Sequence, residues 1–225
     1  MAVRPIFLHE VVDVVGRGGP PYMAHVVGFD AAAAADRGLA LLGTWEVAGS
    51  TGRWPQVVNV WEVDGWDGWA RLAQRTNVAK AANPALAAWW DEAHRHRTGG
   101  VDRLLAGAPG CPTRASLVAD GVRGSWFVHE LSEVRPGAGP EYLAATLELR
   151  VPAMAERGIR LVGLYEAVLS DTEVCTIWAT DVAAHTALLR DGDPWPATAR
   201  QWCTRWREEL MTPGAGSPLA SEEIR

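Results

Sequence analysis

Cysteine and long hydrophobic runs are scarce in this sequence. Its three cysteines, Cys111, Cys175 and Cys203, are scattered and show no Cys-x-x-Cys spacing, which argues against a disulfide framework or a structural zinc and fits a reducing cytoplasm. No stretch approaches the roughly 18 apolar residues that a membrane helix needs. Charges precede any long apolar region at the N-terminus, so no signal peptide is expected. We expect a cytoplasmic protein with no membrane span and no metal site.

A basic surface is also missing. The chain carries 21 Lys and Arg against 27 Asp and Glu, a net charge of -6, and the two signs are interspersed. A nucleic-acid partner is therefore not expected, because such proteins carry a basic patch or stripe. Hydrophobic residues make up 48% of the chain, enough for a substantial core. Twelve Trp accompany only three Phe, but Trp both fills cores and lines ligand sites, so this excess does not choose between them.

The sequence contains a long internal repeat. A shift of 120 residues places 7–50 on 127–170 without a gap, and the His-Glu of "FLHEVV" falls on the His-Glu of "WFVHEL". A slightly shorter offset pairs "VVNVWEVD" with "VCTIWATD". We therefore predict a tandem duplication, with a linker rich in Gly, Pro and Ala between the copies. The predicted units are repeat 1 over 1–105, the linker over 106–123, repeat 2 over 124–212 and a flexible tail over 213–225.

Each repeat reads as strand, helix, strand, strand, helix. Pro20 and Pro21 open the first helix, which we expect to run to Arg37 and to end at Gly38. The second copy predicts a helix from Glu141 to Arg157, kinked at Pro152. This order of elements indicates an α+β fold of two ferredoxin-like repeats, whose sheets pack face to face in one chain.

Several short stretches resemble the NIPSNAP family of the dimeric α+β barrel superfamily. They are "VNVWEVD" at 58–64, "VRPG" at 134–137, "LRVPAMAERG" at 149–158 and "LVGLYE" at 161–166. The resemblance covers nearly both repeats and implies a pseudo-two-fold barrel with a cavity between sheets and helices. The chain departs from the family in its first strand, where His-Glu replaces an Arg-Thr-Tyr-like run. The family also shares no single chemistry, so the resemblance implies the fold much more than the reaction.

Strand alternation predicts a substrate site lined by aromatic residues. Side chains at i and i+2 share one face of a strand, and we expect the face that mixes Trp with polar groups to line the barrel interior. Trp45 and Tyr165 each stand two residues after a glycine, Gly43 and Gly163. We expect the small glycines to leave room there for a flat molecule. The predicted substrate-binding residues are Trp45, Asn59, Trp61, Tyr165, Thr176 and Trp178. The alternative is that these aromatics fill the barrel.

The His-Glu pairs supply the candidate catalytic residues, His9, Glu10, His129 and Glu130. Adjacent strand residues point to opposite faces, so one member of each pair faces the cavity, and alternation alone does not say which. A buried imidazole or carboxyl could move a proton there; the alternative is a structural polar group. We favour the second half, because only it carries Pro152 and His185.

Three functions stay open. The first is a cofactor-independent enzyme, of the cyclase, isomerase or monooxygenase type, that acts on an apolar or aromatic small molecule in bacterial specialised metabolism. The second is a haem protein with His9, His129 or His185 as axial ligand. The third is a non-catalytic small-molecule-binding or scaffold protein. Formation of a homo-oligomer through unpaired edge strands also stays open.

Overall fold

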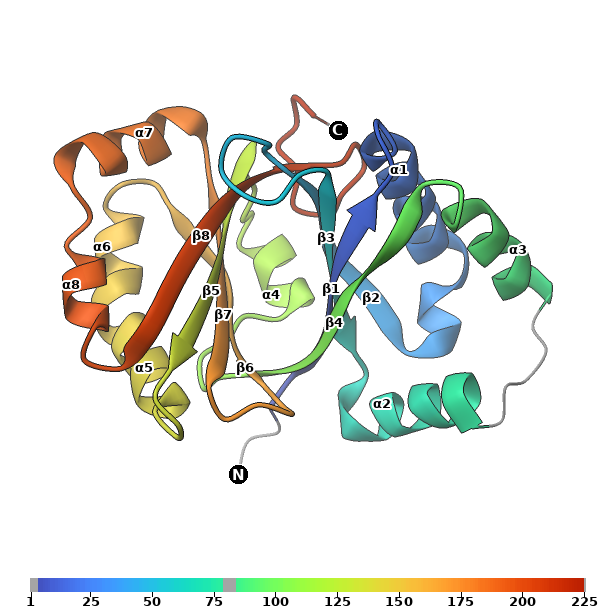
Figure 1. The fold of residues 1–225 in the computed structure, drawn as a ribbon, viewed down its shortest axis with the longest axis horizontal. Helices are drawn as coiled ribbons and strands as arrows, with labels where there is room; N and C mark the ends of the chain where they lie inside the picture. The colour runs from blue at the N-terminus through green and yellow to red at the C-terminus, as the bar shows by residue number, and fades with distance from the viewer. Residues whose placement is uncertain (1–3, 79–83, 225) are drawn as a thin grey trace.

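Alternating apolar strands close into one barrel in the computed structural model, which describes residues 4–78 and 84–224 (Figure 1). All neighbouring strands are antiparallel, in the order β1-β3-β2-β8-β5-β7-β6-β4. The mixed α+β architecture and the closed eight-stranded barrel agree with the predicted fold class. The strands are β1 Ile6–Val14, β2 Leu39–Val47, β3 Gln56–Val63, β4 Arg97–Gly107, β5 Trp126–Val134, β6 Arg160–Ala167, β7 Glu173–Thr180 and β8 Cys203–Pro213.

Helices cover the barrel on two opposite sides, as the right and left of Figure 1 show. On one side lie α1 Gly19–Phe29 with its π-helical and 3-10 extensions Asp30–Ala34 and Ala35–Arg37, α2 Gly65–Ala73 with the π turn Gln74–Val78, and α3 Pro84–Ala93. On the other lie α5 Gly139–Ala145, the π turn Thr146–Arg150, α6 Val151–Ala155, α7 Val182–Asp191 and α8 Trp195–Ala199. Between β4 and β5 runs the short α4 Arg114–Ala119.

The first helix of each half ends irregularly. In the second half a π turn precedes Pro152, which stands in the first turn of α6. The helix predicted from Glu141 to Arg157 is thus broken into segments. The first half has a π turn at Asp30–Ala34 without a proline, so proline alone does not account for the irregularity. Gly38 caps that helix with φ +70°, as its position predicts.

The predicted linker over 106–123 contains regular structure, namely α4 and the last two residues of β4. The 11-residue strand β4 pairs along its length with β1 and, through Leu105, Ala106 and Gly107, with β6. Three residue pairs also join β2 to β8, which closes the ring. Every strand of the described chain therefore has two neighbours, and closure removes the edge strands that had left self-association open.

The C-terminal residues cover one end of the barrel, contrary to the prediction of a flexible tail. Leu219 and Ala220 are fully buried, and Leu219 belongs to the interior core. The Ser217 hydroxyl accepts a hydrogen bond of 3.1 Å from the backbone N–H of Thr44. Ala220 also bridges to Gly124. The Gly- and Pro-rich composition of this segment suggested mobility, but its few apolar residues find a core to join.

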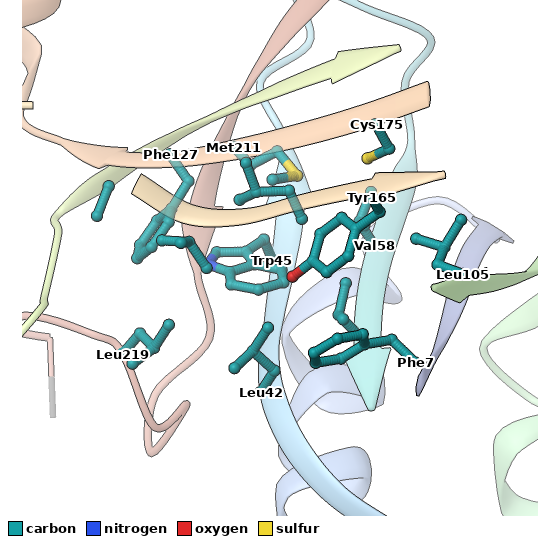
Figure 2. Packing of buried hydrophobic residues seen from close by; sticks show 14 of the residues in the cluster. Phe7, Leu42, Trp45, Val58, Leu105, Phe127, Tyr165, Cys175, Met211 and Leu219 are labelled. Atoms are coloured by element: carbon teal, nitrogen blue, oxygen red, sulfur yellow. The ribbon is translucent and has the colours of Figure 1, made fainter. Parts of the chain in front are cut away.

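The barrel interior is packed with apolar side chains from both halves (Figure 2). Trp45 and Tyr165 lie inside it and have no solvent exposure. A Cβ at Gly43 would lie 2.1 Å from the Trp45 ring, and Gly163 meets the Tyr165 ring in the same way. The aromatic ring itself therefore occupies the space beside each glycine, and no room is left for a flat ligand. This agrees with the alternative that side chains fill a small barrel.

Candidate functional site

The polar residues of the middle strands face the helices, which corrects the predicted orientation. Trp61 packs with Tyr22 and Met23 of α1, and Trp178 packs with Met154 and Leu188 on the other side of the barrel. The valines that alternate with Trp61 on β3 face the interior instead. These valines help to fill the closed barrel, whereas Trp61 and Asn59 find their hydrogen-bond partners under the helices. Trp45 and Tyr165 thus lie on the interior face of the sheet, whereas Trp61 and Trp178 lie on the helix face. The two pairs share no cavity.

In the first half, Glu10 is the centre of a hydrogen-bonded group under α1. The Trp61 indole N–H and the Asn59 amide donate to the same oxygen, Oε2, at 3.0 and 3.1 Å. Asn59 is held in turn by the Thr44 hydroxyl, which donates to its Oδ1 at 2.7 Å, and its amide also reaches the Tyr22 hydroxyl at 3.3 Å. These contacts fix the rotamer of a partly buried carboxyl while its second oxygen stays free of them.

The surroundings of Glu10 raise its pKa above the ordinary value for a carboxyl. Burial is the main cause, the hydrogen bonds from Trp61 and Asn59 and the Arg97 charge lower the pKa, and the Asp102 charge on the neighbouring strand raises it further. No cation lies within ion-pair distance of Glu10 among residues 4–78 and 84–224. A positioned carboxyl with a raised pKa can act as general acid or base near neutral pH.

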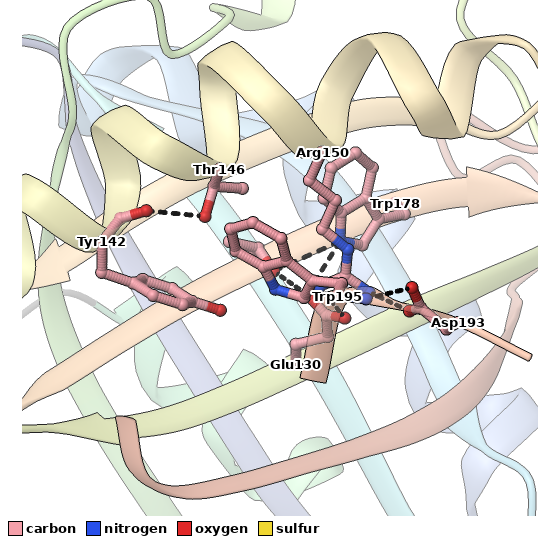
Figure 3. Close-up of polar contacts among 8 residues, drawn as sticks. Glu130, Tyr142, Thr146, Arg150, Trp178, Asp193 and Trp195 are labelled. Atoms are coloured by element: carbon pink, nitrogen blue, oxygen red, sulfur yellow. Dashed lines mark hydrogen bonds and ion pairs between the residues drawn. The ribbon is translucent and has the colours of Figure 1, made fainter. Parts of the chain in front are cut away.

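In the second half, the equivalent Glu130 is closed off by an arginine. Arg150 approaches Glu130 at 2.6 Å and Asp193 at 3.2 Å, and the side chains of Arg150 and Glu130 are 2% and 1% exposed. The Arg150 guanidinium lies over the rings of Trp178 and Trp195, 5.2 and 5.5 Å from their centroids (Figure 3). Burial acts to lower the pKa of Arg150, but the Glu130 and Asp193 charges outweigh it and raise that pKa.

The remaining polar contacts of Glu130 match those of Glu10. The Trp178 indole donates to Glu130 Oε2 at 2.9 Å, and the Thr176 hydroxyl also donates to this oxygen. Sequence reasoning missed Arg150, which decides the difference between the halves. A signal was present: Arg150 falls on Asp30 at the 120-residue offset, so a base stands where the first copy has an acid.

The two candidate histidines meet inside the barrel. Their Nε2 atoms are 3.0 Å apart, and His129 Nδ1 lies 2.9 Å from a carboxylate oxygen of Glu209. Both rings are fully buried. Burial, His129 and Arg103 lower the pKa of His9. Although burial acts to raise it, the hydrogen bond from His129 lowers the pKa of Glu209. The sulfur of Cys175 lies within 4.8 Å of nitrogens of both imidazoles.

A cavity lies on the helix side of the first half. It measures about 590 Å³, between α1 and α3, and is lined by Phe29 and Trp89 together with alanines, Asp36 and two arginines, Arg37 and Arg75. Phe29 packs edge-on against Trp61, with ring centroids 5.9 Å apart, so the cavity wall contacts the indole that holds Glu10. The cavity beside Arg150 measures about 240 Å³, below the range of about 300–1,000 Å³ typical of ligand sites.

His9, His129 and His25 do not fit an axial haem ligand. His9 and His129 face each other inside a packed barrel, where a porphyrin has no room. His185 is buried on the side of the smaller cavity. His25 borders the larger cavity, but its Nε2 contacts the Trp89 carbonyl at 3.0 Å and its ring stacks on that indole. The Nε2 atoms of His9, His129 and His25 are all engaged in contacts within the protein, so we derive no step through haem.

Comparison with known proteins identifies the fold. No family model and no curated protein matches the sequence. Two solved structures, candidate monooxygenases from Fusobacterium nucleatum and Lactobacillus acidophilus, each superpose with a TM-score of 0.63 at 10% identity. They cover 95% and 93% of this chain and 94% of their own. A candidate chlorite dismutase superposes with a TM-score of 0.53 at 11% identity, over 94% of this chain and 96% of its own. The chain therefore has the fold of the dimeric α+β barrel proteins.

In the described part of the chain, no helix has the length and apolarity to cross a membrane.

Proposed function

We propose that this chain is an enzyme that binds an apolar or aromatic small molecule under the helices of its first half, where Glu10 moves a proton. The observation that supports the proposal is that two carboxyls at matching positions of the repeat, Glu10 and Glu130, have different partners. Glu130 is neutralised by Arg150 at 2.6 Å, whereas Glu10 is oriented by two donors and keeps one oxygen outside these contacts. A buried ion pair is a poor proton donor or acceptor, because breaking it strands a charge. The proposal thus moves the working group from the second half, which the sequence favoured, to the first.

The cavity whose wall residue Phe29 packs on Trp61, the donor to Glu10, suits a molecule with an apolar body and an anionic end. Phe29 and Trp89 form flat apolar walls. Burial and the neighbouring Arg75 lower the pKa of Arg37. Among the described residues neither arginine forms an ion pair with a protein carboxylate, so a ligand carboxylate or phenolate would supply the missing charge. His25 borders the same space.

The internal repeat supports an origin of both barrel halves from one duplicated unit. The β1–β3 register places Glu10 opposite Asn59, and the β5–β7 register places Glu130 opposite Thr176. We propose that the chain is a tandem duplication of one NIPSNAP-like ferredoxin-like unit with pseudo-two-fold symmetry, and that it serves bacterial specialised metabolism in the cytoplasm. One copy then keeps a site while the other is free to become structural.

Activity is tested first with a panel of polycyclic phenols and aromatic carboxylic acids, incubated in air with purified protein and analysed by mass spectrometry. Oxygenation heads the panel because two proteins of similar fold are candidate monooxygenases; isomerisation and cyclisation follow. Glu10→Gln should lower the rate about 100- to 10,000-fold, as removal of a general acid or base does. The amide keeps an acceptor for Trp61, so folding should survive.

A matched control separates a catalytic role from a general effect of charge. Glu46 is a partly buried carboxyl on β2 whose pKa burial also raises, and Glu46→Gln should leave the rate within about two-fold. Equal losses in both variants would contradict the proposal. Ligand binding without turnover in wild type, unchanged by Glu10→Gln, would favour the non-catalytic binding protein. A Soret band after haemin titration would favour the haem protein instead.

A further inference from the structure

We propose that the barrel interior binds a single copper(I) ion between His9, His129 and Cys175. The three side chains come from β1, β5 and β7 and are essentially without solvent exposure. One donor atom from each lies within 4.8 Å of the other two. Figure 2 shows Cys175 among the side chains of the interior core. The arrangement is independent of the site proposed around Glu10, which lies on the opposite face of the sheet.

The hydrogen bond to Glu209 prepares His129 as a ligand. With Nδ1–H donated to this carboxylate at 2.9 Å, the lone pair of Nε2 points toward His9, whose Nε2 is 3.0 Å away. A carboxylate behind a ligating imidazole is the usual outer contact at metal sites, because it fixes the tautomer and raises the basicity of the ligand. His9 Nδ1 is buried without a hydrogen-bond partner in the described structure, so the His–His contact leaves this ring only partly satisfied.

The position of Glu209 also distinguishes the two halves. Register places His129 opposite Glu209 on β8 and His9 opposite Arg103 on β4. The anion orients one imidazole, and Arg103 disfavours a proton charge on the other. The second effect favours the neutral form of His9, which is the form that binds metals.

The number and kind of donors favour copper. Two imidazoles and one thiolate form the trigonal set found at copper sites, whereas a structural zinc site takes four protein ligands. With metal–nitrogen and metal–sulfur bonds of about 2.0 and 2.3 Å, a trigonal ion would need the nitrogens to part by about 0.5 Å and the sulfur to approach by at most about 1 Å. Side-chain rotation supplies shifts of this size.

Binding requires one deprotonation and no redox step. The Cys175 S–H bond is replaced by a sulfur–copper bond, the proton leaves to solvent, and the copper stays Cu(I). Burial raises the pKa of the metal-free Cys175 thiol, and the bound cation reverses that preference.

A route into the interior begins at one end of the barrel. A cavity of about 210 Å³ opens there, lined among others by Arg103 and Leu131. Leu131 packs against the interior core and pairs in register with Cys175. The Arg103 charge acts on His9. Two residues that line this cavity are therefore strand partners of donors: Leu131 of Cys175 and Arg103 of His9.

The test is an anaerobic titration of the reduced, metal-free full chain with Cu(I) in competition with bicinchoninate. We expect the protein to remove one equivalent of copper from the chelator. Cys175→Ser and His129→Asn should abolish this uptake. Glu209→Gln should keep one equivalent but lower the affinity about 10- to 100-fold, as loss of an outer carboxylate does. The matched control is Cys203→Ser, which alters a partly buried thiol outside the interior core and should bind copper as wild type does.

X-ray absorption on copper-loaded wild type provides a readout that does not depend on the folding of any variant. Two nitrogen ligands and one sulfur ligand would support the proposal. No uptake above that of Cys175→Ser, two or more sulfur ligands, or a Cys175-dependent site that takes zinc and not copper would overturn it.

Discussion

Removal of Arg150 should show that Glu130 is a structural residue. The Arg150 nitrogen lies 2.6 Å from Glu130, and both side chains are almost fully buried. At an effective dielectric constant of about 20, this attraction is about 6 kcal/mol, most of which offsets the cost of burying the two charges. Arg150→Met fills similar volume but strands the carboxylate, which costs about 3–5 kcal/mol when one partner of a buried pair is removed.

Urea unfolding followed by circular dichroism at pH 7 measures this loss as a change in the free energy of unfolding. The double variant Arg150→Met/Glu130→Gln should be more stable than the sum of the two single changes predicts, with a coupling of about 1–3 kcal/mol. At pH 5 part of the Arg150→Met loss should return, because the stranded carboxyl can take up a proton.

Glu10→Gln provides the comparison, because the same strand position in the first half carries no ion pair. It should cost less than about 1 kcal/mol, since no buried charge is left unpaired and the amide keeps an acceptor. A cost below about 1 kcal/mol for Arg150→Met, or an equal cost for Glu10→Gln, would refute the assignment of a structural role to Glu130 and a free carboxyl to Glu10.

Three further predictions concern packing, pH and the C-terminus. Gly43→Ala should destabilise the fold by about 1–3 kcal/mol or more in urea unfolding, because the new Cβ would lie 2.1 Å from the Trp45 ring; Gly28→Ala, with no heavy atom within 4 Å, is the control. Burial and the Glu130 charge raise the pKa of Glu208 from 4.5 to about 7. The folded state therefore holds this proton more tightly, and stability falls as pH rises between these values. Glu208→Gln should be more stable than wild type at pH 8 and equal to it at pH 4; a stabilisation that is the same at both would contradict the reasoning. Truncation after Pro213 should lower the melting temperature by several degrees, because it removes the buried Leu219, and an unchanged value would show that the segment contributes nothing to the core.

The amino-acid sequence alone determined the local elements and the way in which they recur. Strand alternation and turn residues indicated three strands in each repeat but not the 11-residue strands β4 and β8, and the 120-residue offset by itself matched Glu10 with Glu130. The closed α+β barrel agrees with that prediction. Local patterns suffice here because alternation and capping depend on neighbouring residues only.

Tertiary structure decided which face of each strand meets which layer. Both faces of β1 are apolar enough to be buried, so alternation separated His9 from Glu10 without saying which of them faces the helices. The predicted orientation of Trp61 was wrong because its indole N–H and the Asn59 amide find their acceptor, Glu10, on the helix side of the sheet. Arg150 lies 20 residues from Glu130 in the chain, yet it becomes the partner of that carboxyl because α5 and its π turn fold back over β5. No local pattern encodes such a contact, since it depends on how a helix docks on a sheet, and this docking makes one carboxyl an ion pair and leaves its equivalent free.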